Sequence, residues 1–433
     1  MKLTEDMQKA MDIIQNTNEH VFITGKAGTG KTTFLKHLVK NTGKKCVVAA
    51  PTGVAAIQAH GMTLHSLFSL PFHLVLPNDA LDYKFTTQKK ELLIGIDILI
   101  IDEISMVRPD ILDTIDRKLR WVREDDRPFG GVQIVMFGDL FQLPPVIKSD
   151  DWKVLKDYYD DYFFFNALVF KQTGFHVIEL NKIFRQTDDE FINVLNKIRD
   201  YQATTEELDM LGEVKDKNAC NTFNDEYIHL CTHKREVDRI NTENLGGEYV
   251  TFEAQIEGKF PDSSAPCDKT LCVRVGARVM VLVNNLRERY YNGSLGVVVA
   301  ITDNIIKVKL DSGISVEFER YKWSNIQYSL QDDKVVEEEI GKCVQFPLTL
   351  AWAITIHKSQ GLTFDKVALH ISKTFCAGQL YVALSRCRSL EGIITDAFVT
   401  KKMIIPNYTL ADFERAYQAD GNYYGRKVIA HED

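Results

Sequence analysis

The 433-residue sequence lacks the features that mark membrane, secreted and disulfide-rich proteins. No apolar run is long enough to span a bilayer, and the N-terminus, MKLTEDMQKA, contains no hydrophobic signal segment. The eight cysteines form no C-x-x-C pair, and none lies at zinc-ligand spacing from a histidine. We therefore expect reduced, buried thiols in a cytoplasmic protein that has no membrane partner.

The sequence also has no excess of basic residues. Its formal net charge is −8 at pH 7, so any nucleic-acid site must be a local basic or polar track. Apolar residues make up 45% and charged residues 26%, which is ordinary for a globular protein. A chain of this length is too long for one hydrophobic core, and we expect about two to four domains.

One glycine-rich stretch indicates nucleotide binding. Residues 25–32, GKAGTGKT, fit the phosphate-loop pattern G-x-x-x-x-G-K-[ST]. Glycines let backbone amides curl round a triphosphate, and the following helix turns its positive end toward it. Lys31 would reach the β- and γ-phosphates, and the Thr32 hydroxyl would bind Mg²⁺. A buried strand at 20–24 and a helix at 32–40 flank the loop, which makes a glycine turn without a ligand the weaker alternative.

Two further strands end in polar residues. In IDILIIDEIS (96–105) an apolar run leads directly to Asp102 and Glu103. Beside a phosphate loop, Asp102 would hold Mg²⁺ and Glu103 would take a proton from the attacking water, whereas solvated turn acids are the alternative. Gln142, in GDLFQLPPV (138–146), follows another strand, where its amide would touch the γ-phosphate and the neighbouring domain.

Three other candidates have weaker signals. The amide of Gln8, on the first predicted helix, could face adenine, although its spacing alone favours a solvated glutamine. Arg185, in NKIFRQ (181–186), could reach the γ-phosphate across a domain seam, although a surface arginine is favoured by its context alone. Arg386 ends a helix predicted over 377–392, and either stabilises that helix end or enters an ATP cleft.

Nucleic-acid contacts are predicted in three segments. APTGVAA (50–56) ends a buried strand, where ligands bind in open α/β sheets. GMTLHSLFSLPF (61–72) mixes hydroxyls, an imidazole and aromatics, and TIHKSQG (355–361) combines small polar and basic side chains. For the segment 61–72, a surface excursion whose aromatics cover a small core is an equal alternative.

The strand pattern predicts an α/β fold in two halves with an insertion. About five buried strands end at 176–180 and, with a helix at 109–123, indicate a RecA-like doubly wound parallel sheet. The same pattern returns at 346–371. Between the halves, residues 243–345 contain short β-branched strands punctuated by NG, SG and DN, which predict a small β-barrel.

The order of these motifs resembles that of superfamily-one DNA helicases. It is similar to the Pif-type (petite integration frequency) helicases and their RecD-type relatives in GKAGTGKT, APTGVAA, GMTLHSLF, IDEIS, GDLFQLPP, FRQ, AITIHKSQGLTF and YVALSRCRS. Residues 109–131 resemble the signature of the Pif-type branch, and the resemblance covers about residues 1–395. It implies an ATP- and Mg²⁺-dependent enzyme that moves 5′-to-3′ on single-stranded DNA.

The resemblance also implies roles at the matching positions. The catalytic residues would be Lys31, Glu103, Gln142 and the arginine fingers Arg185 and Arg386. The nucleotide would contact Gln8, Gly28, Thr29, Gly30, Lys31, Thr32, Thr33 and Gly361, with Thr32 and Asp102 on the metal. Single-stranded DNA would contact Thr52, Gly53, Thr63, His65, Phe68, Phe72, Thr355, His357 and Lys358.

We therefore expect two RecA-like domains with two insertions. The expected parts are domain 1A at 1–65 and 90–181, a wedge insertion (1B) at 66–89, domain 2A at 182–242 and 346–412, an SH3-like β-barrel (2B) at 243–345 and an appendage at 413–433. Phe68, Pro71 and Phe72 are the candidate strand-separating residues of the wedge.

The favoured hypothesis is a helicase that unwinds duplex DNA at single/double-strand junctions, monomeric in solution and of bacterial type. Pif-type relatives also act on four-stranded guanine structures, for which the sequence contains no recognisable dedicated element. An RNA translocase and a nucleotide-gated nucleic-acid-binding ATPase that does not translocate are the alternatives. A small-molecule kinase would leave residues 346–393 without a role.

Overall fold

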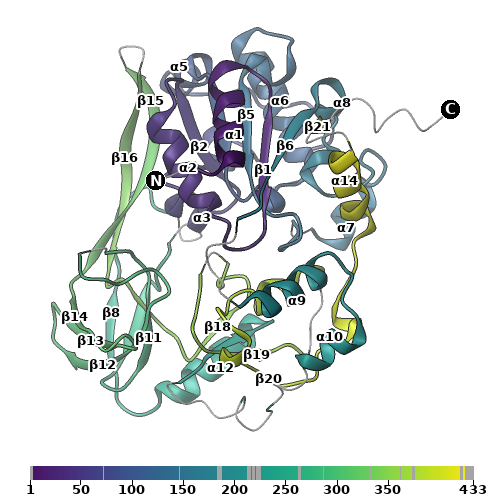
Figure 1. The fold of residues 1–433 in the computed structure, drawn as a ribbon. Helices are drawn as coiled ribbons and strands as arrows, with labels where there is room; N and C mark the ends of the chain where they lie inside the picture. Colours follow the sequence, from purple (N-terminus) through teal and green to yellow (C-terminus); the bar gives the residue numbers. More distant parts are fainter. Residues whose placement is uncertain are drawn as a thin grey trace.

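The computed structural model of the chain describes residues 3–71, 73–145, 147–182, 188–211, 216, 220, 226–261, 265–285, 287–331, 334–360, 362–372, 376–419 and 423–424. Two α/β lobes and an antiparallel β unit make up this part of the chain (Figure 1). The parallel-sheet α/β fold class predicted from the sequence is confirmed. Among these residues, no helix has the length and apolar character needed to cross a bilayer.

The first lobe is built on a seven-stranded sheet in the order β21-β6-β1-β5-β4-β2-β3. All its strands are parallel except β21, which pairs antiparallel with β6. Both faces of the sheet are covered, and its inner strands β2 (CVVAA) and β4 (ILII) are continuous apolar runs. The bounds are β1 Val21–Gly25, β2 Cys46–Ala50, β3 Met62–Thr63, β4 Ile98–Ile101, β5 Gln133–Phe137, β6 Phe175–Leu180 and β21 Tyr423–Tyr424.

Helices cover this sheet on both faces. Val21 and Ile23 of β1 belong to one core with α1 and α2, whereas Phe22 between them belongs to the opposite core with α6. The predicted helix at 109–123 is confirmed as α6. The helices are α1 Glu5–Asn16, α2 Lys31–Asn41, α3 Gly53–Gln58, α4 Leu64–Phe68, α5 Thr87–Gly95, α6 Pro109–Arg123, α7 Ser149–Leu155 and α8 Phe170–Thr173, with 3-10 turns at Ile104–Met106, Pro128–Gly131 and Phe164–Asn166.

The second lobe has a smaller parallel sheet in the order β18-β7-β19-β20. Its strands are β7 Ile228–Cys231, β18 Ala353–Thr355, β19 Val367–His370 and β20 Ile393–Thr395. Its helices are α9 Asp189–Arg199, α10 Thr205–Met210, α12 Lys234–Leu245 and α13 Gln379–Leu384, with 3-10 turns at Leu390–Gly392 and Lys401–Met403. The helix predicted over 377–392 is thus much shorter, because Arg386 and Cys387 leave it to pair with Phe364.

The antiparallel unit follows the insertion predicted over 243–345. A five-stranded sheet in the order β14-β13-β12-β11-β17 shares one core with the pair β8 and β10. The bounds are β8 Val250–Glu253, β9 Gln255–Gly258, β10 Thr270–Val273, β11 Arg278–Val281, β12 Leu295–Ile301, β13 Ile306–Leu310, β14 Ser315–Phe318, β15 Tyr321–Gln331, β16 Lys334–Gln345 and β17 Leu348–Leu350. The long β15–β16 hairpin rises from this unit along the first lobe (Figure 1), where Ile326 packs against the core on the α6 side.

Helix α14 (Tyr408–Ala419) returns from the second lobe to the first. Leu410, Phe413 and Tyr417 lie in the first-lobe core, and the Phe413 ring stacks on Phe165 with ring centroids 4.2 Å apart. Phe413 and Tyr417, in the segment predicted as an appendage, are therefore part of this core. Helix α14 joins the two lobes a second time, beyond the direct connection before α9.

Candidate active site

The phosphate loop connects the end of β1 to the beginning of α2. Gly28 and Gly30 have φ angles of 83° and 86°, a left-handed conformation that is strained for residues with a side chain. The Lys31 amine donates hydrogen bonds to the carbonyl oxygens of Gly25 at 2.5 Å and Lys26 at 3.1 Å. Helix N-terminal amides and the Lys31 charge therefore lie together, as an anion site requires.

The paired acids lie at the end of β4, as predicted. Asp102 is fixed to the adjacent strand by its N–H, which donates to the Ala49 carbonyl at 2.9 Å. Glu103 has a φ of 50° and a ψ of 43°, a left-handed conformation that is uncommon outside glycine and frequent at functional sites. Its N–H donates to the Asp102 carboxylate at 3.0 Å.

Burial sets the protonation of both acids. It raises the pKa of Glu103, the Asp102 charge raises it further, and Lys31 and Arg386 lower it. Burial also raises the pKa of Asp102, whereas the hydrogen bond from the Glu103 N–H and the Lys31 charge lower it. The acids thus carry an unfavourable density of negative charge, which a cation would relieve.

Gln142 and Asp139 follow β5 on the same edge of the sheet. The Gln142 amide donates to the Asp139 carboxylate at 3.1 Å, and the other oxygen of Asp139 accepts the Phe141 N–H at 3.1 Å. Asp139 is buried and Gln142 nearly so. This carboxylate therefore determines where the Gln142 side chain points.

The second lobe reaches the phosphate loop through α13 and the turn that follows it. The Ala27 N–H of the loop donates to the Tyr381 hydroxyl at 3.0 Å. Arg386 is almost fully buried and donates to the carbonyls of Val382 at 2.9 Å and Ser359 at 3.2 Å. Its charge also lowers the pKa of Glu103. Groups from both lobes thus converge on one cleft.

The positions of the remaining predicted nucleotide-binding residues do not by themselves indicate a nucleotide contact. The Thr29 hydroxyl is buried and donates to the Lys26 carbonyl at 2.9 Å, whereas Thr32 and Thr33 are exposed on the first turn of α2. Gln8 is exposed on α1, and its amide donates to Asp12 at 2.9 Å, so adenine contact stays a prediction. Arg185, Gly361 and Phe72 lie outside the residues that the structure describes.

Two of the predicted DNA-contact hydroxyls serve as helix caps. Thr52 accepts the Ala55 N–H at 3.2 Å at the start of α3, and Thr63 accepts the Ser66 N–H at 3.1 Å at the start of α4. Gly53 is buried in the first turn of α3. His65, on α4, is partly buried, and burial and the Arg108 charge lower its pKa.

The second-lobe candidates form a turn directly after β18. Thr355 accepts the Lys358 N–H at 3.1 Å, and Lys358 is exposed. Burial lowers the pKa of His357, so this imidazole is neutral at pH 7. These residues and the caps of α3 and α4 share a position just beyond the carboxyl ends of parallel strands, the usual ligand-binding edge of such sheets.

Phe68 does not lie where a base-contacting residue would. Its side chain is fully buried in the first-lobe core, so the ring has no exposed surface to offer a base. The segment after it is held down by α6, because the Lys118 amine donates to the carbonyls of Ser69 at 3.2 Å and Asp82 at 2.7 Å. Of the two alternatives for residues 61–72, a segment whose aromatics fill a core fits Phe68 better.

The sequence interpretation missed Asp139 and Tyr381. Both lie in motifs quoted for the resemblance, Asp139 in GDLFQLPP and Tyr381 in YVALSRCRS. An acid directly after a buried strand was a usable signal for Asp139. The hydroxyl of Tyr381 meets the phosphate loop 354 residues away, and no local pattern announces such a contact.

Comparisons with known proteins agree with this geometry. A family described as PIF1-like helicase matches residues 2–211. The ATP-dependent DNA helicase Pif1 of Bdellovibrio bacteriovorus is 32% identical over 408 residues, which cover 91% of this chain and 87% of that relative. A crystal structure of Bacteroides sp Pif1 in complex with ADP-AlF4 is 64% identical, has a TM-score of 0.95, and covers 98% of this chain and 99% of its own. This chain belongs to the PIF1-like helicase family.

Vertebrate PIF1 proteins are longer than this chain. The ATP-dependent DNA helicase PIF1 of Mus musculus is 31% identical over 406 residues, which cover 90% of this chain but 59% of the mouse protein. The chain therefore spans about three fifths of that relative. Bacteroides Pif1 bound to single-stranded DNA is also 64% identical but has a TM-score of 0.73, so the present arrangement is closer to the ADP-AlF4 complex.

Proposed function

We propose that this chain is an ATP-driven DNA helicase that moves 5′-to-3′ on single-stranded DNA and unwinds the duplex ahead of it. The observation that supports this most directly is the convergence of both lobes on the phosphate loop. Tyr381 meets the Ala27 N–H, and Arg386 acts electrostatically on Glu103. A simple nucleotide switch does not need a second sheet at its nucleotide.

Each cleft residue has a role suited to its chemistry. Lys31 would leave the carbonyls of Gly25 and Lys26 for the β- and γ-phosphates. Glu103 would accept the proton of the attacking water, a role for which its raised pKa is suited. Gln142, with Arg386, would stabilise charge on the terminal phosphate. Arg185 and Gln8 keep their predicted roles as a second arginine finger and an adenine contact.

The donor set fits a magnesium ion. Thr32 and Asp102 offer hard oxygen ligands beside the phosphate loop, and the Asp102 charge raises the pKa of the adjacent Glu103. When bound, Mg²⁺ would neutralise charge on the phosphates. It would also lower the pKa of both carboxyls, so that Glu103 is ionised when hydrolysis begins.

The DNA track would run along the carboxyl ends of the strands in both lobes. Lys358 supplies an exposed positive charge, and the turns at Thr52, Thr63 and Thr355 supply backbone and hydroxyl donors. A solved structure of Bacteroides Pif1 is described as bound to single-stranded DNA, and another Pif1 structure is described as explaining DNA unwinding at forked duplex DNA by two coordinating helicases. We propose that this chain binds the same two kinds of DNA and is a monomer in solution.

The domain division is part of the proposal. We assign the two parallel sheets to the motor domains 1A and 2A, the antiparallel unit to 2B, and residues 66–89 to the strand-separating 1B insertion. In that insertion, Phe72 and Pro71 remain the candidate wedge residues. Phe68 would support them from the core.

Strand displacement on tailed duplexes tests the function. Purified protein is mixed with ATP, Mg²⁺ and a short duplex carrying a single-stranded tail at either its 5′ or its 3′ end. The proposal expects displacement from the 5′-tailed substrate only, and none when ATP is replaced by a non-hydrolysable analogue. Displacement from the 3′-tailed substrate would overturn the polarity, and DNA-stimulated ATPase without any displacement would favour the nucleotide-gated binding protein.

A further inference from the structure

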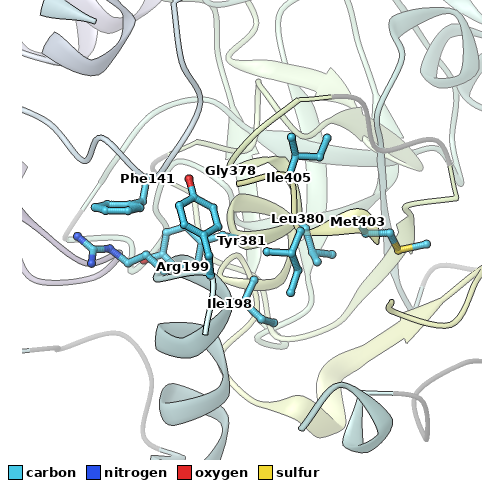
Figure 2. A pocket seen from close by; sticks show the side chains of 10 residues that line it. Phe141, Ile198, Arg199, Gly378, Leu380, Tyr381, Met403 and Ile405 are labelled. Atoms are coloured by element: carbon cyan, nitrogen blue, oxygen red, sulfur yellow. The ribbon is translucent and has the colours of Figure 1, made fainter. Parts of the chain in front are cut away.

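A buried arginine joins the two lobes beside the cleft. Arg199 is the last residue of α9 in the second lobe and is only 2% exposed. Its guanidinium lies over the Phe141 ring of the first lobe, 4.1 Å from the ring centroid (Figure 2). A buried arginine requires compensating partners, because an unpaired charge in the interior is strongly unfavourable.

Four carboxylates surround this guanidinium. Asp200 and Glu414 approach it at 2.8 Å and 3.3 Å, and Asp139 and Glu179 at 3.7 Å and 3.9 Å. Burial lowers the pKa of Arg199, but the carboxylates, Asp139 first, raise it overall, so the side chain stays charged. Asp200 directly follows α9, Asp139 follows β5, Glu179 lies on β6 and Glu414 lies on the C-terminal helix α14.

The contact with Asp139 links Arg199 to the candidate γ-phosphate sensor. One Asp139 oxygen faces the Arg199 Nε, and the other accepts the Gln142 amide at 3.1 Å. Arg199, Asp139 and Gln142 therefore form a chain from α9 to the sensor side chain. A move of α9 relative to the first lobe would displace the carboxylate that orients Gln142.

The same segment also lies close to Gly378, the residue directly before α13. A Cβ added to Gly378 would lie 2.1 Å from the Gln142 carbonyl and 2.5 Å from that of Phe141, and Gly378 has a φ of 74°. Residues 139–142 are thus approached both by Arg199 and by the start of α13, the helix that carries Tyr381 to the phosphate loop. Arg199 and Gly378, which both approach this segment, belong to the second lobe.

We propose that Arg199 is the positioning residue through which the second lobe and α14 set the orientation of Gln142, and so couple the lobe arrangement to nucleotide state. This inference rests on the proposed function. Arg199 is not among the residues proposed to contact the nucleotide. It acts through Asp139, and the charge, planar shape and burial of its guanidinium suit it to hold several acids at once.

The test compares Arg199→Met and Arg199→Lys with the matched control Arg239→Met, which removes an exposed arginine paired with Glu243 on α12. Two assays are used: one measures ATPase kcat and KM with single-stranded DNA, and the other measures the ratio of DNA affinities with and without ADP-AlF4. For Arg199→Met we expect kcat to fall about tenfold, KM to change less than about threefold, and the affinity ratio to approach one. Arg199→Lys should recover part of the ratio, and Arg239→Met should match the wild type.

A second variant separates positioning from stability. Arg199→Met alone leaves Asp139 buried without its cation, which should lower the melting temperature. The double variant Arg199→Met/Asp139→Asn removes that charge and should regain stability without regaining the affinity ratio. Recovery of both would show a purely structural role, and a wild-type ratio in Arg199→Met would overturn the proposal. If the wild-type protein itself neither hydrolysed ATP nor bound DNA, the proposed function would fail instead.

Discussion

The nucleotide cleft and the proposed DNA track are built in different ways. In the cleft, Lys31, Asp102, Glu103, Gln142 and Arg386 are brought together from both lobes, and Gln142 and Arg386 are buried. Along the track, Thr52 and Thr63 are partly exposed and cap short helices. The cleft therefore depends on particular charges at particular places, whereas the track depends on the shape of turns that several residue types could form.

This difference explains how reliably each could be predicted from sequence. A lysine in a phosphate loop and two acids after a buried strand have few other uses, and the structure places them together. A threonine before a short helix is equally consistent with a cap and with a phosphate contact. Phe68 shows the same ambiguity, because an aromatic side chain can stack on a base or fill a core.

Long-range packing was beyond sequence reasoning altogether. Arg199 looks like an ordinary basic residue near a helix end, and only the return of α14 to the first lobe brings Glu414 to it. The length of the β15–β16 hairpin and its contact with the first lobe likewise depend on tertiary structure. Parallel sheets, α6 and the insertion were predictable because each leaves a local signal in the sequence: apolar runs in the buried strands, a helical apolar period in α6, and turn dipeptides between the short strands of the insertion.

The largest expected effect breaks the cleft while leaving the track intact. Lys31→Ala should lower ATP hydrolysis by about two orders of magnitude or more, because the terminal phosphates lose their main cation. Affinity for single-stranded DNA, measured by fluorescence anisotropy without nucleotide, should stay near that of the wild type. The control is Lys40→Ala, an exposed lysine on the same helix. Unwinding by Lys31→Ala would disprove the assignment of the phosphate loop as the site of the ATP hydrolysis that drives unwinding.

The next effect concerns the boundary between track and core. Phe68→Ala should lower the free energy of unfolding by about 3–5 kcal/mol, since it leaves a cavity in a closed core. Phe398→Ala, which truncates a ring that is 55% exposed, is the control. Urea unfolding of both variants measures the two free energies of unfolding. A stable Phe68→Ala protein with impaired unwinding and normal ATPase activity would show that Phe68 acts in strand separation and not in the core.

The smallest expected effects are on stability alone, and they compare one substitution in the nucleotide cleft with one in the proposed DNA track. Glu103→Gln should raise the melting temperature by about 2 °C or more at pH 8, because it removes a buried negative charge beside Asp102. Thr63→Ala should instead destabilise the protein by about 1 kcal/mol through loss of a helix cap.

The pH dependence of the Glu103→Gln effect carries a definite sign. The folded-state pKa of Glu103 is raised, so the folded protein holds this proton more tightly than the unfolded chain does. The ionised Glu103 carboxylate therefore destabilises the folded wild type at high pH, and this destabilisation is lost as the pH falls through the folded-state pKa. The difference in melting temperature should shrink between about pH 8 and about pH 5, and a constant difference would show that Glu103 is not the titrating group.

The central claim is that the second lobe supplies positive charge to a nucleotide bound on the first. Single-turnover ATP hydrolysis by Arg386→Ala tests it most directly, measured together with ATP affinity and against Arg388→Ala, an exposed arginine two positions away that pairs with Asp365. We predict that Arg386→Ala hydrolyses ATP about a hundredfold or more slowly while binding it within several-fold of the wild type. Unchanged hydrolysis in Arg386→Ala would contradict the claim.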